Sequence, residues 1–212
     1  MRPFAGAILT LSLLLGGCAT APVSDTAGGI SPGNLSIPEY AVWQFRGRVS
    51  LVREEQGWHA SLDWHESGGR YRLRLSGPLG QGALQVDGDG GSVRLRTADG
   101  SEYRAADADT LVESATGWQL PVAGIRYWVR GIPAPGVEAR ITTDDRGRLQ
   151  RLDQSGWDIH YDRYLEVDGR EWPTRLRLAT ADISIRLVVD QWTLSNSPQE
   201  VTADPAPATV SP

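Results

Sequence analysis

One cysteine is placed where it could carry a covalent lipid. Cys18 is the only cysteine among the 212 residues, and it follows directly after Leu15, Gly16 and Gly17. This ending resembles a bacterial lipobox, in which the cysteine sulfur receives a diacylglyceryl thioether, the chain is cut before it, and the new amino terminus is acylated. A lone cysteine elsewhere in a chain is more often an inert buried side chain. The position and flanks of Cys18 therefore favour lipidation.

The segment before Cys18 predicts export. A basic start at Met1-Arg2-Pro3 leads into an apolar run from Phe4 to Leu15, and small residues precede the cut site. This is the organisation of a secretory signal. The run is too short to span a bilayer as a helix. We expect residues 1–17 to be a signal peptide that is removed, and the rest of the chain to be held at a membrane by its acylated cysteine.

Composition excludes several classes of chemistry. All 21 basic residues are arginines, which excludes a P-loop lysine, a Schiff-base lysine and a Ser-Lys dyad. A single cysteine forms no internal disulfide, so a packed core must stabilise the domain. The net charge of −5 argues against a nucleic-acid partner. No Ser/His/Asp set or carboxylate pair stands in a recognisable setting, so we expect no catalytic residues, no cofactor and no enzyme, a lipid-modifying hydrolase included.

One row of polar residues imitates a metal or acid–base site. His59, Asp63 and His65 are spaced to share one face of a strand. Alternating polar residues on the wet face of a sheet produce such rows routinely. We therefore predict no metal site here.

Composition also divides the chain into one domain and two flexible ends. Residues 18–38 contain many small residues and prolines, which predicts a lipidated flexible tether reaching on the order of 25 Å. Residues 195–212 are rich in Pro, Ala, Ser and Thr and predict a disordered tail. The folded domain is then residues 39–194.

The domain is dominated by two-residue alternation of apolar and polar side chains. This period predicts antiparallel strands with one wet face, and Gly- and Asp-rich turns separate them. The residues predicted to point inward are Trp58, Ala60, Leu62, Trp64, Tyr71, Leu73, Leu75, Val93, Leu95, Trp157, Ile159, Tyr161, Leu176, Leu178, Ile183, Ile185 and Leu187.

Two segments break the alternation and predict short helices. One runs over residues 106–116 and ends at Gly117; the other runs over residues 122–130 and is stopped by Gly131 and Pro133. We expect a mainly β fold, with about 10–11 strands in a large curved antiparallel sheet and two or three short helices against its apolar concave face.

The inward face is rich in aromatic residues, since the chain has eight tryptophans. For any single tryptophan a packed core is the better interpretation. Two or three helices are too few to fill the mouth of so large a sheet, so a partly open apolar cavity is the competing interpretation for the whole face. The side chains expected to line such a cavity are Trp64, Leu73, Leu75, Leu84, Ile125, Trp128, Trp157, Tyr161, Leu176, Leu178 and Trp192.

The loop over residues 77–82 carries one isolated apolar side chain. Leu79 lies between Pro78 and Gly80. The glycines superficially suggest a phosphate loop, but no helix follows, so we discount it. Leu79 either folds back onto the sheet or is exposed to contact membrane or lipid. The pattern alone slightly favours the first interpretation.

The ordered features together resemble the LolB family of Gram-negative bacteria over residues 43–192. No single piece is diagnostic, but their order and spacing are specific. The matching pieces are Trp43-Gln44-Phe45-Arg46-Gly47-Arg48, Asp63-Trp64, Tyr71-Arg72-Leu73-Arg74-Leu75 leading into Gly77-Pro78-Leu79-Gly80, the helix from Ala105 to Gly117 with Leu120-Pro121, Trp128-Val129-Arg130-Gly131-Ile132-Pro133, Gly156-Trp157-Asp158-Ile159-His160-Tyr161, and the final strand from Leu187 to Trp192.

The resemblance implies an outer-membrane receptor that faces the periplasm. Its fold would be an unclosed antiparallel β-barrel with helices over an apolar cavity. The cavity would accept the acyl chains of lipoproteins from the periplasmic carrier LolA, and the receptor, acting as a monomer, would insert that cargo into the outer membrane. The family's loop leucine falls on Leu79, which favours a membrane-delivery role for Pro78, Leu79 and Gly80. Ala19 after the cysteine agrees with the enterobacterial rule for outer-membrane sorting.

One departure and one alternative go with this resemblance. The segment between Cys18 and Trp43 is short, and Pro38 restricts any helix there. The competing function is a structural or interaction lipoprotein, a scaffold in outer-membrane assembly with a filled core. Binding of an apolar dye would separate an open cavity from a filled one.

Overall fold

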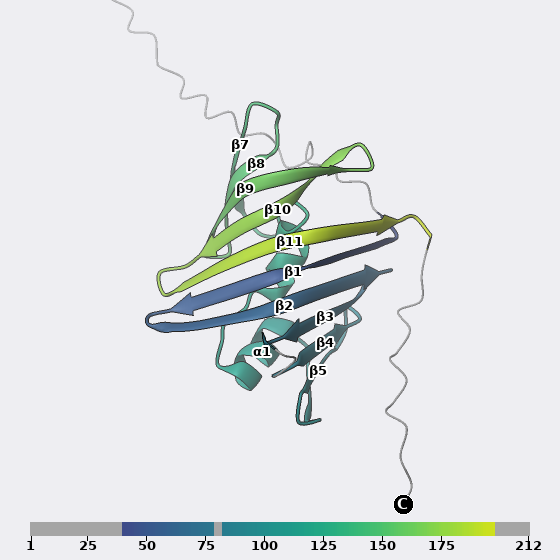
Figure 1. Cartoon of the computed structure of the whole chain (residues 1–212), viewed down its shortest axis with the longest axis vertical. Helices are drawn as coiled ribbons and strands as arrows, with labels where there is room; N and C mark the ends of the chain where they lie inside the picture. The colour runs from purple at the N-terminus through teal and green to yellow at the C-terminus, as the bar shows by residue number, and fades with distance from the viewer. Residues whose placement is uncertain (1–39, 79–81, 198–212) are drawn as a thin grey trace, which may run out of the picture.

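The computed structural model describes residues 40–78 and 82–197 (Figure 1). Cys18, Leu79 and Gly80 lie outside these residues, as do the predicted signal peptide and tether and most of the predicted tail. In the described part of the chain, no helix is both long and apolar enough to cross a bilayer.

Within the described residues, eleven antiparallel strands form one curved sheet. Its order is β6-β5-β4-β3-β2-β1-β11-β10-β9-β8-β7, so β6 and β7 are the two edges and, among the described residues, do not pair with each other. The prediction of an unclosed antiparallel sheet is therefore confirmed. The strands are β1 (Val42–Arg53), β2 (Gln56–Ser67), β3 (Arg70–Ser76), β4 (Leu84–Gly88), β5 (Val93–Thr97), β6 (Glu102–Ala105), β7 (Ala139–Thr143), β8 (Leu149–Gln154), β9 (Trp157–Val167), β10 (Arg170–Ala179) and β11 (Ile183–Ser195).

The first and last strands are neighbours at the centre of the sheet. Val42 lies opposite Ser195, and Arg53 lies opposite Ile183. A bulge between Arg46 and Gly47 shifts this register. At Gly47 the strands approach so closely that a Cβ would overlap the carbonyl oxygen of Val188. Glycine at this position therefore permits the pairing that joins the two halves of the sheet.

Burial follows the predicted alternation. On β3, for example, Tyr71, Leu73 and Leu75 are buried, while Arg70 and Arg74 are exposed. Because apolar side chains gain free energy only on the covered face, this period fixes which side of each strand faces the helices.

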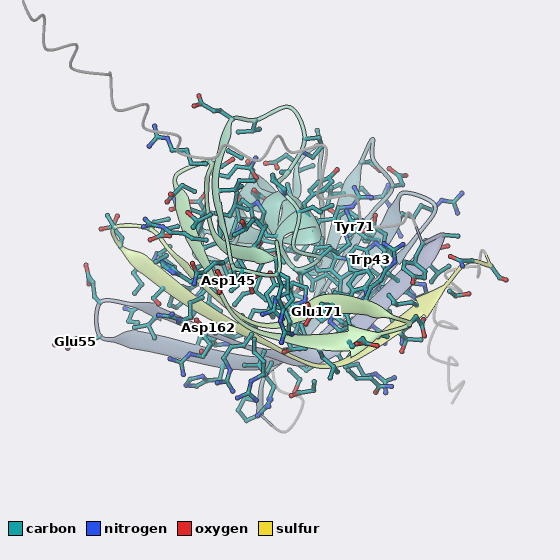
Figure 2. All side chains as sticks on the ribbon, turned by 90° about the horizontal axis from the view of Figure 1, so that it is seen from above. Trp43, Glu55, Tyr71, Asp145, Asp162 and Glu171 are labelled. Atoms are coloured by element: carbon teal, nitrogen blue, oxygen red, sulfur yellow. The ribbon has the colours of Figure 1, made fainter. Side chains whose placement is uncertain are left out.

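In the part of the chain that the structure describes, two helices lie inside the curve of the sheet, which Figure 2 shows from above. They are α1 (Ala108–Thr116) and α2 (Val122–Trp128). Asp107 caps α1 by accepting hydrogen bonds from the backbone N–H groups of Asp109 and Thr110, at 3.2 and 2.9 Å. Hydrogen bonding to Thr110 lowers the pKa of the Asp107 carboxyl.

The helix ends also follow local rules, with one correction. Gly117 ends α1 in the left-handed conformation, with φ of 73°, as its glycine predicts. The second helix ends at Trp128, two residues before the expected Arg130. Gly131, with φ of 76°, completes the turn that follows.

An aromatic cluster fills one end of the concave face. Trp43 and Trp64 stack at 5.9 Å between ring centroids, and Trp64 lies 5.6 Å from Tyr71. Trp192 contacts both Phe45, at 5.2 Å, and Trp172, at 4.9 Å. Such pairs add to the free energy that burial already provides. This end of the half-barrel is a packed core.

A buried ion pair fixes α2 to β2 beside this cluster. The Arg126 Nε donates to both carboxylate oxygens of Glu66, at 2.7 and 2.8 Å. The Glu66 residue is only 7% exposed. The guanidinium also lies 5.5 Å from the ring centroid of Tyr71. Hydrogen bonding to Glu66 raises the pKa of Arg126, so the guanidinium keeps its charge in this half-buried position.

Candidate functional site

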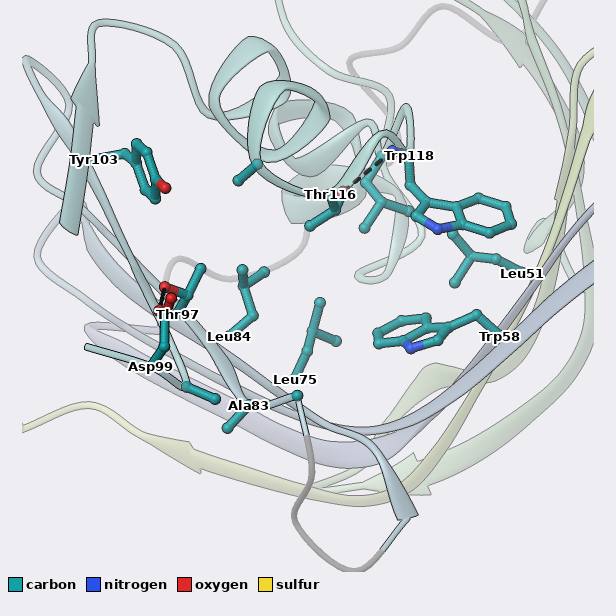
Figure 3. Close-up of a pocket in the computed structure, with 14 residues that line it drawn as sticks. Leu51, Trp58, Leu75, Ala83, Leu84, Thr97, Asp99, Tyr103, Thr116 and Trp118 are labelled. Atoms are coloured by element: carbon teal, nitrogen blue, oxygen red, sulfur yellow. Dashed lines mark hydrogen bonds between the residues drawn. The ribbon is translucent and has the colours of Figure 1, made fainter. Parts of the chain in front are cut away.

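A cavity of about 500 Å³ opens at the other end of the concave face, between the sheet and α1 (Figure 3). Its position follows from β1 and β2, because these strands carry the aromatic cluster at one end and the cavity at the other. It is lined by Leu51, Trp58, Leu75, Gly82, Ala83, Leu84, Thr97, Ala98, Asp99, Tyr103, Ala115, Thr116, Trp118 and Leu120.

The floor of the cavity consists of cross-strand pairs. Leu51 lies opposite Trp58 across β1 and β2, and Leu75 lies opposite Leu84 across β3 and β4. In Figure 3 these side chains face the end of α1 and Trp118. Paired apolar residues on one face of a sheet make a continuous apolar surface, which suits a hydrocarbon ligand.

The roof is joined to the sheet by Arg53. Its Nη1 donates to the carbonyl oxygen of Gly117 at 3.0 Å, and its guanidinium lies 4.8 Å from the ring centroid of Trp118. Both contacts hold the residues after α1 against the end of β1. Because Trp118 is only half-buried, one side of its ring stays available to the cavity.

The acidic group at the rim, Asp99, is hydrogen-bonded within the chain. Asp99 accepts hydrogen bonds from the Thr97 hydroxyl and from the backbone N–H of Ser101. The bond from Thr97 is the main cause of a lowered pKa at Asp99. These bonds shape a turn, and the carboxylate is held as an anion at the edge of the apolar cavity.

Two of the residues predicted to line a cavity, Leu75 and Leu84, do line this one. The others do not lie along it. Ile125 is half-buried against the core, and the rest are buried within it: Trp64, Leu73, Trp128, Trp157, Tyr161, Leu176, Leu178 and Trp192. A ligand in the cavity would reach this second group only if the packing changed.

Sequence reasoning misses several of the lining residues. The alternation places Trp58 correctly on the inward face, but nothing in its pattern separates it from the packed Trp64. Trp118 and Leu120 lie in the connection between α1 and α2, where no periodicity shows their direction. Tyr103 is on the edge strand β6 and is 48% exposed. The signal available for Tyr103 and Trp118 is a large aromatic residue among polar neighbours.

The predicted delivery loop begins at the end of β3. Gly77 is half-buried and Pro78 is exposed. Because Leu79 and Gly80 are outside the described residues, both interpretations of Leu79 stay predictions.

Within the described residues, Asp63 of the histidine row forms an ion pair, while the buried Nε2 of His65 has no hydrogen-bond partner. Arg46 donates to Asp63 at 3.0 Å. Burial, and secondarily the charge of Arg72, lowers the pKa of His65. Among residues 40–78 and 82–197, no three His, Cys, Asp or Glu side chains are grouped so that they could hold a metal ion.

Filling the cavity should weaken binding of apolar ligands. We expect Ala115→Trp, which places a large ring from α1 into the cavity, to weaken binding of an apolar fluorescent dye about tenfold, since losing about 1.4 kcal/mol of burial has that effect. Ser114→Trp is the matched control, because Ser114 is the exposed neighbour on the same helix. Dye titration with both variants would check this; equal binding by Ala115→Trp and the parent would show that the dye binds elsewhere.

Comparison with known proteins gives one consistent result. The family model described as "Outer membrane lipoprotein LolB" matches residues 41–192. An outer-membrane lipoprotein LolB of Pseudomonas paraeruginosa is 38% identical over 185 residues, covering 84% of this chain and 90% of its own. One from Pseudomonas putida is 40% identical over 150 residues, covering 71% and 73%.

A solved structure agrees at the level of the fold. The LolA superfamily protein of Nitrosomonas europaea has a TM-score of 0.52 at 9% identity, covering 78% of this chain and 90% of that one. The match to the family model over residues 41–192, together with these relatives, shows that the chain belongs to the outer membrane lipoprotein LolB family.

Proposed function

We propose that this protein is an outer-membrane-anchored receptor that accepts acylated lipoproteins from the periplasmic carrier LolA and inserts them into the outer membrane. The observation that carries the proposal is the apolar cavity of about 500 Å³ between the sheet and α1, in a member of the LolB family. The receptor would act as a monomer on the periplasmic face, without a cofactor or nucleic acid, and without catalysing a reaction.

The cargo explains why such a cavity is needed. Exposing three acyl chains of about 15 methylenes each to water costs on the order of 36 kcal/mol, at about 0.8 kcal/mol per methylene. Transfer between two apolar cavities avoids this cost, and it needs no nucleotide if each successive site binds the cargo more favourably.

The size of the cavity suggests how it accepts that cargo. A volume of about 500 Å³ is within the range that holds one drug-sized ligand. Because the aromatic cluster fills the other end of the face, we propose that further room comes from displacing the residues between α1 and α2. The contacts that resist this displacement include those of Arg53 with Gly117 and Trp118 and the hydrogen bond from Gln119 to Glu113.

The anchor and the delivery loop have separate tasks in this proposal. Acyl groups on Cys18 and on its new amino terminus would provide stable attachment, which a single chain does not. Burying one leucine gives only about 1.5–3 kcal/mol, too little to anchor a protein but enough to bias a brief contact. Leu79 would therefore guide the cargo into the bilayer.

A hand-over experiment tests the receptor directly. Unlipidated Cys18→Ala protein, exported with another signal, is mixed with LolA that carries a triacylated lipoprotein, and a pull-down shows where the cargo ends. We expect the cargo to move onto the Cys18→Ala protein. When that protein also carries Ala115→Trp, the cargo should stay with LolA. Cargo that stays on a competent carrier in both mixtures would contradict the receptor proposal and favour the assembly scaffold.

The delivery loop can be tested apart from acceptance. We expect Leu79→Glu to accept cargo normally but to deliver it to vesicles at least about tenfold more slowly, since inserting a leucine into the bilayer provides about 1.5–3 kcal/mol that a glutamate does not. Gln81→Glu adds the same charge two residues further along the loop and should deliver at the parent rate. Equal delivery rates for Leu79→Glu and the parent would refute a role for Leu79.

A further inference from the structure

The convex face of the sheet carries an unusual row of basic side chains. Five side chains lie in one line across the sheet, and we refer to them as the basic row. They are His59 on β2, Arg186 on β11, Arg177 on β10, His160 on β9 and Arg151 on β8. The register is direct, since Arg186 pairs with Arg177, Arg177 with His160, and His160 with Arg151. Ser50 of β1 completes the line between His59 and Arg186.

Such a row is unfavourable for the sheet itself. Like charges directly opposite each other on neighbouring strands destabilise the pair. Two of the arginines have acidic partners, because Arg177 donates to Asp162 at 2.7 and 2.8 Å and Arg151 donates to Asp158 at 2.9 Å. In the described residues Arg186 makes no ion pair. The residue opposite it is another arginine, Arg177, which is itself paired with Asp162.

A hollow of about 540 Å³ lies at the His59 end of the basic row, beside Arg186. Small residues form it, since Ser50, Ser61 and Ser76 occupy outward positions on three neighbouring strands. Longer side chains stand around them, namely Arg48, His59 and Arg186. The hollow therefore offers guanidinium groups and hydroxyls at one place on an otherwise acidic protein.

The charges at the hollow favour an anion. Arg48 donates to Asp190 at 2.8 and 3.1 Å, so that pair is neutral overall, whereas no acidic side chain of residues 40–78 and 82–197 forms an ion pair with Arg186. Guanidinium groups bind phosphate oxygens through paired N–H donors, and serine hydroxyls add further donors. A phosphate group is thus the chemistry that matches the site.

The position of the hollow identifies the source of that phosphate. Gly77 and Pro78 form part of its wall, and the chain continues from Pro78 directly into Leu79. The proposed function requires Leu79 to contact the apolar part of a bilayer. The wall formed by Gly77 and Pro78 would then lie at the level of the phospholipid headgroups. Arginines are stable at this level because their stems stay apolar while their charged ends reach phosphate.

We infer that the hollow between Arg48, His59 and Arg186 binds phospholipid headgroups and orients the convex face toward the membrane during delivery. The inference rests on the membrane-facing position proposed for the Leu79 loop. Because the whole chain has a net charge of −5, an anionic surface repels most of it, and the basic row selects one face for contact.

Vesicle binding by the full-length Cys18→Ala protein tests this without cargo or carrier. We expect Arg186→Gln to weaken binding to phosphatidylglycerol vesicles about fivefold, as expected for one arginine at an anionic surface. Binding to phosphatidylcholine vesicles should change less, and added salt should reduce the difference between the variants. Arg140→Gln on the edge strand β7 is the matched control, since Arg140 is also exposed.

Three results would overturn the inference. They are equal losses for Arg186→Gln and Arg140→Gln, no loss for Arg186→Gln, or binding of inorganic phosphate by a protein that does not bind vesicles. Arg186→Gln relieves a like-charge contact and should unfold at the same or a higher temperature, so weaker vesicle binding would not reflect a weakened fold. Hand-over from LolA involves no vesicle. If hand-over fails while Arg186→Gln still weakens vesicle binding, only the receptor proposal is contradicted.

Discussion

Gly47→Ala should lower the free energy of unfolding by about 3 kcal/mol, the upper end of the cost of overpacking a core. The added Cβ would overlap the Val188 carbonyl oxygen and would lie 3.1 Å from the Val189 Cα. These are backbone atoms, so no side-chain rotation can relieve the overlap. The two central strands, β1 and β11, must separate locally instead. Urea unfolding followed by tryptophan fluorescence would measure the loss.

Gly57→Ala is the matched control for that prediction. Gly57 lies on β2, and the nearest atom to an added Cβ is the Leu51 carbonyl oxygen at 3.9 Å, which is an ordinary contact. Alanine there should leave stability unchanged or raise it slightly, since it restricts the unfolded chain. Identical unfolding midpoints for Gly47→Ala and Gly57→Ala would show that the bulge adapts to the extra atom.

Removing one partner of the buried ion pair should have a similarly large effect. We expect Glu66→Ala to lower the free energy of unfolding by about 3 kcal/mol, the low end of the cost of leaving a buried charge unpaired. The low end applies because the Arg126 side chain is still 21% exposed. Denaturant unfolding would measure it, with circular dichroism at zero denaturant as the check on folding.

Two further variants show whether charge is the cause. The double variant Glu66→Met with Arg126→Met removes both charges and should recover most of the lost stability. Asp63→Ala breaks an exposed ion pair, in which the Arg46 side chain is 66% exposed and the Asp63 side chain 56%. This variant should lower the free energy of unfolding by less than about 1 kcal/mol. A double variant as unstable as Glu66→Ala would assign the effect to packing around α2.

The strands and the first helix can be predicted because their signals are local. Leu73 and Leu75 show their inward direction by period alone, and Gly117 shows where α1 stops. The end of α2 is less predictable, since its final turn depends on packing: Trp128 is fully buried and its indole N–H donates to Gln154 at 2.8 Å.

The lining of the cavity cannot be predicted from the same signals. Trp58 and Trp64 both point inward from β2, yet Trp64 packs against Phe45 and Tyr71 while Trp58 faces the cavity. The difference depends on what lies across from each ring, and therefore on how the helices cover the sheet. Periodicity describes the direction of a side chain and carries no information on whether that space is filled.

The central pairing of β1 with β11 has a consequence for the order of events in an exported chain. Contacts between the two ends of a sequence are slow to form, because the loop between them must close first. Until β11 emerges, β1 has one unpaired edge, which is a site for aggregation. If the chain is exported as the signal peptide predicts, the domain would be exposed to aggregation until β11 has crossed the inner membrane. Cys18 would emerge long before β11. If it is acylated as proposed, acylation would precede folding, and the anchor would be in place before there is a cavity to fill.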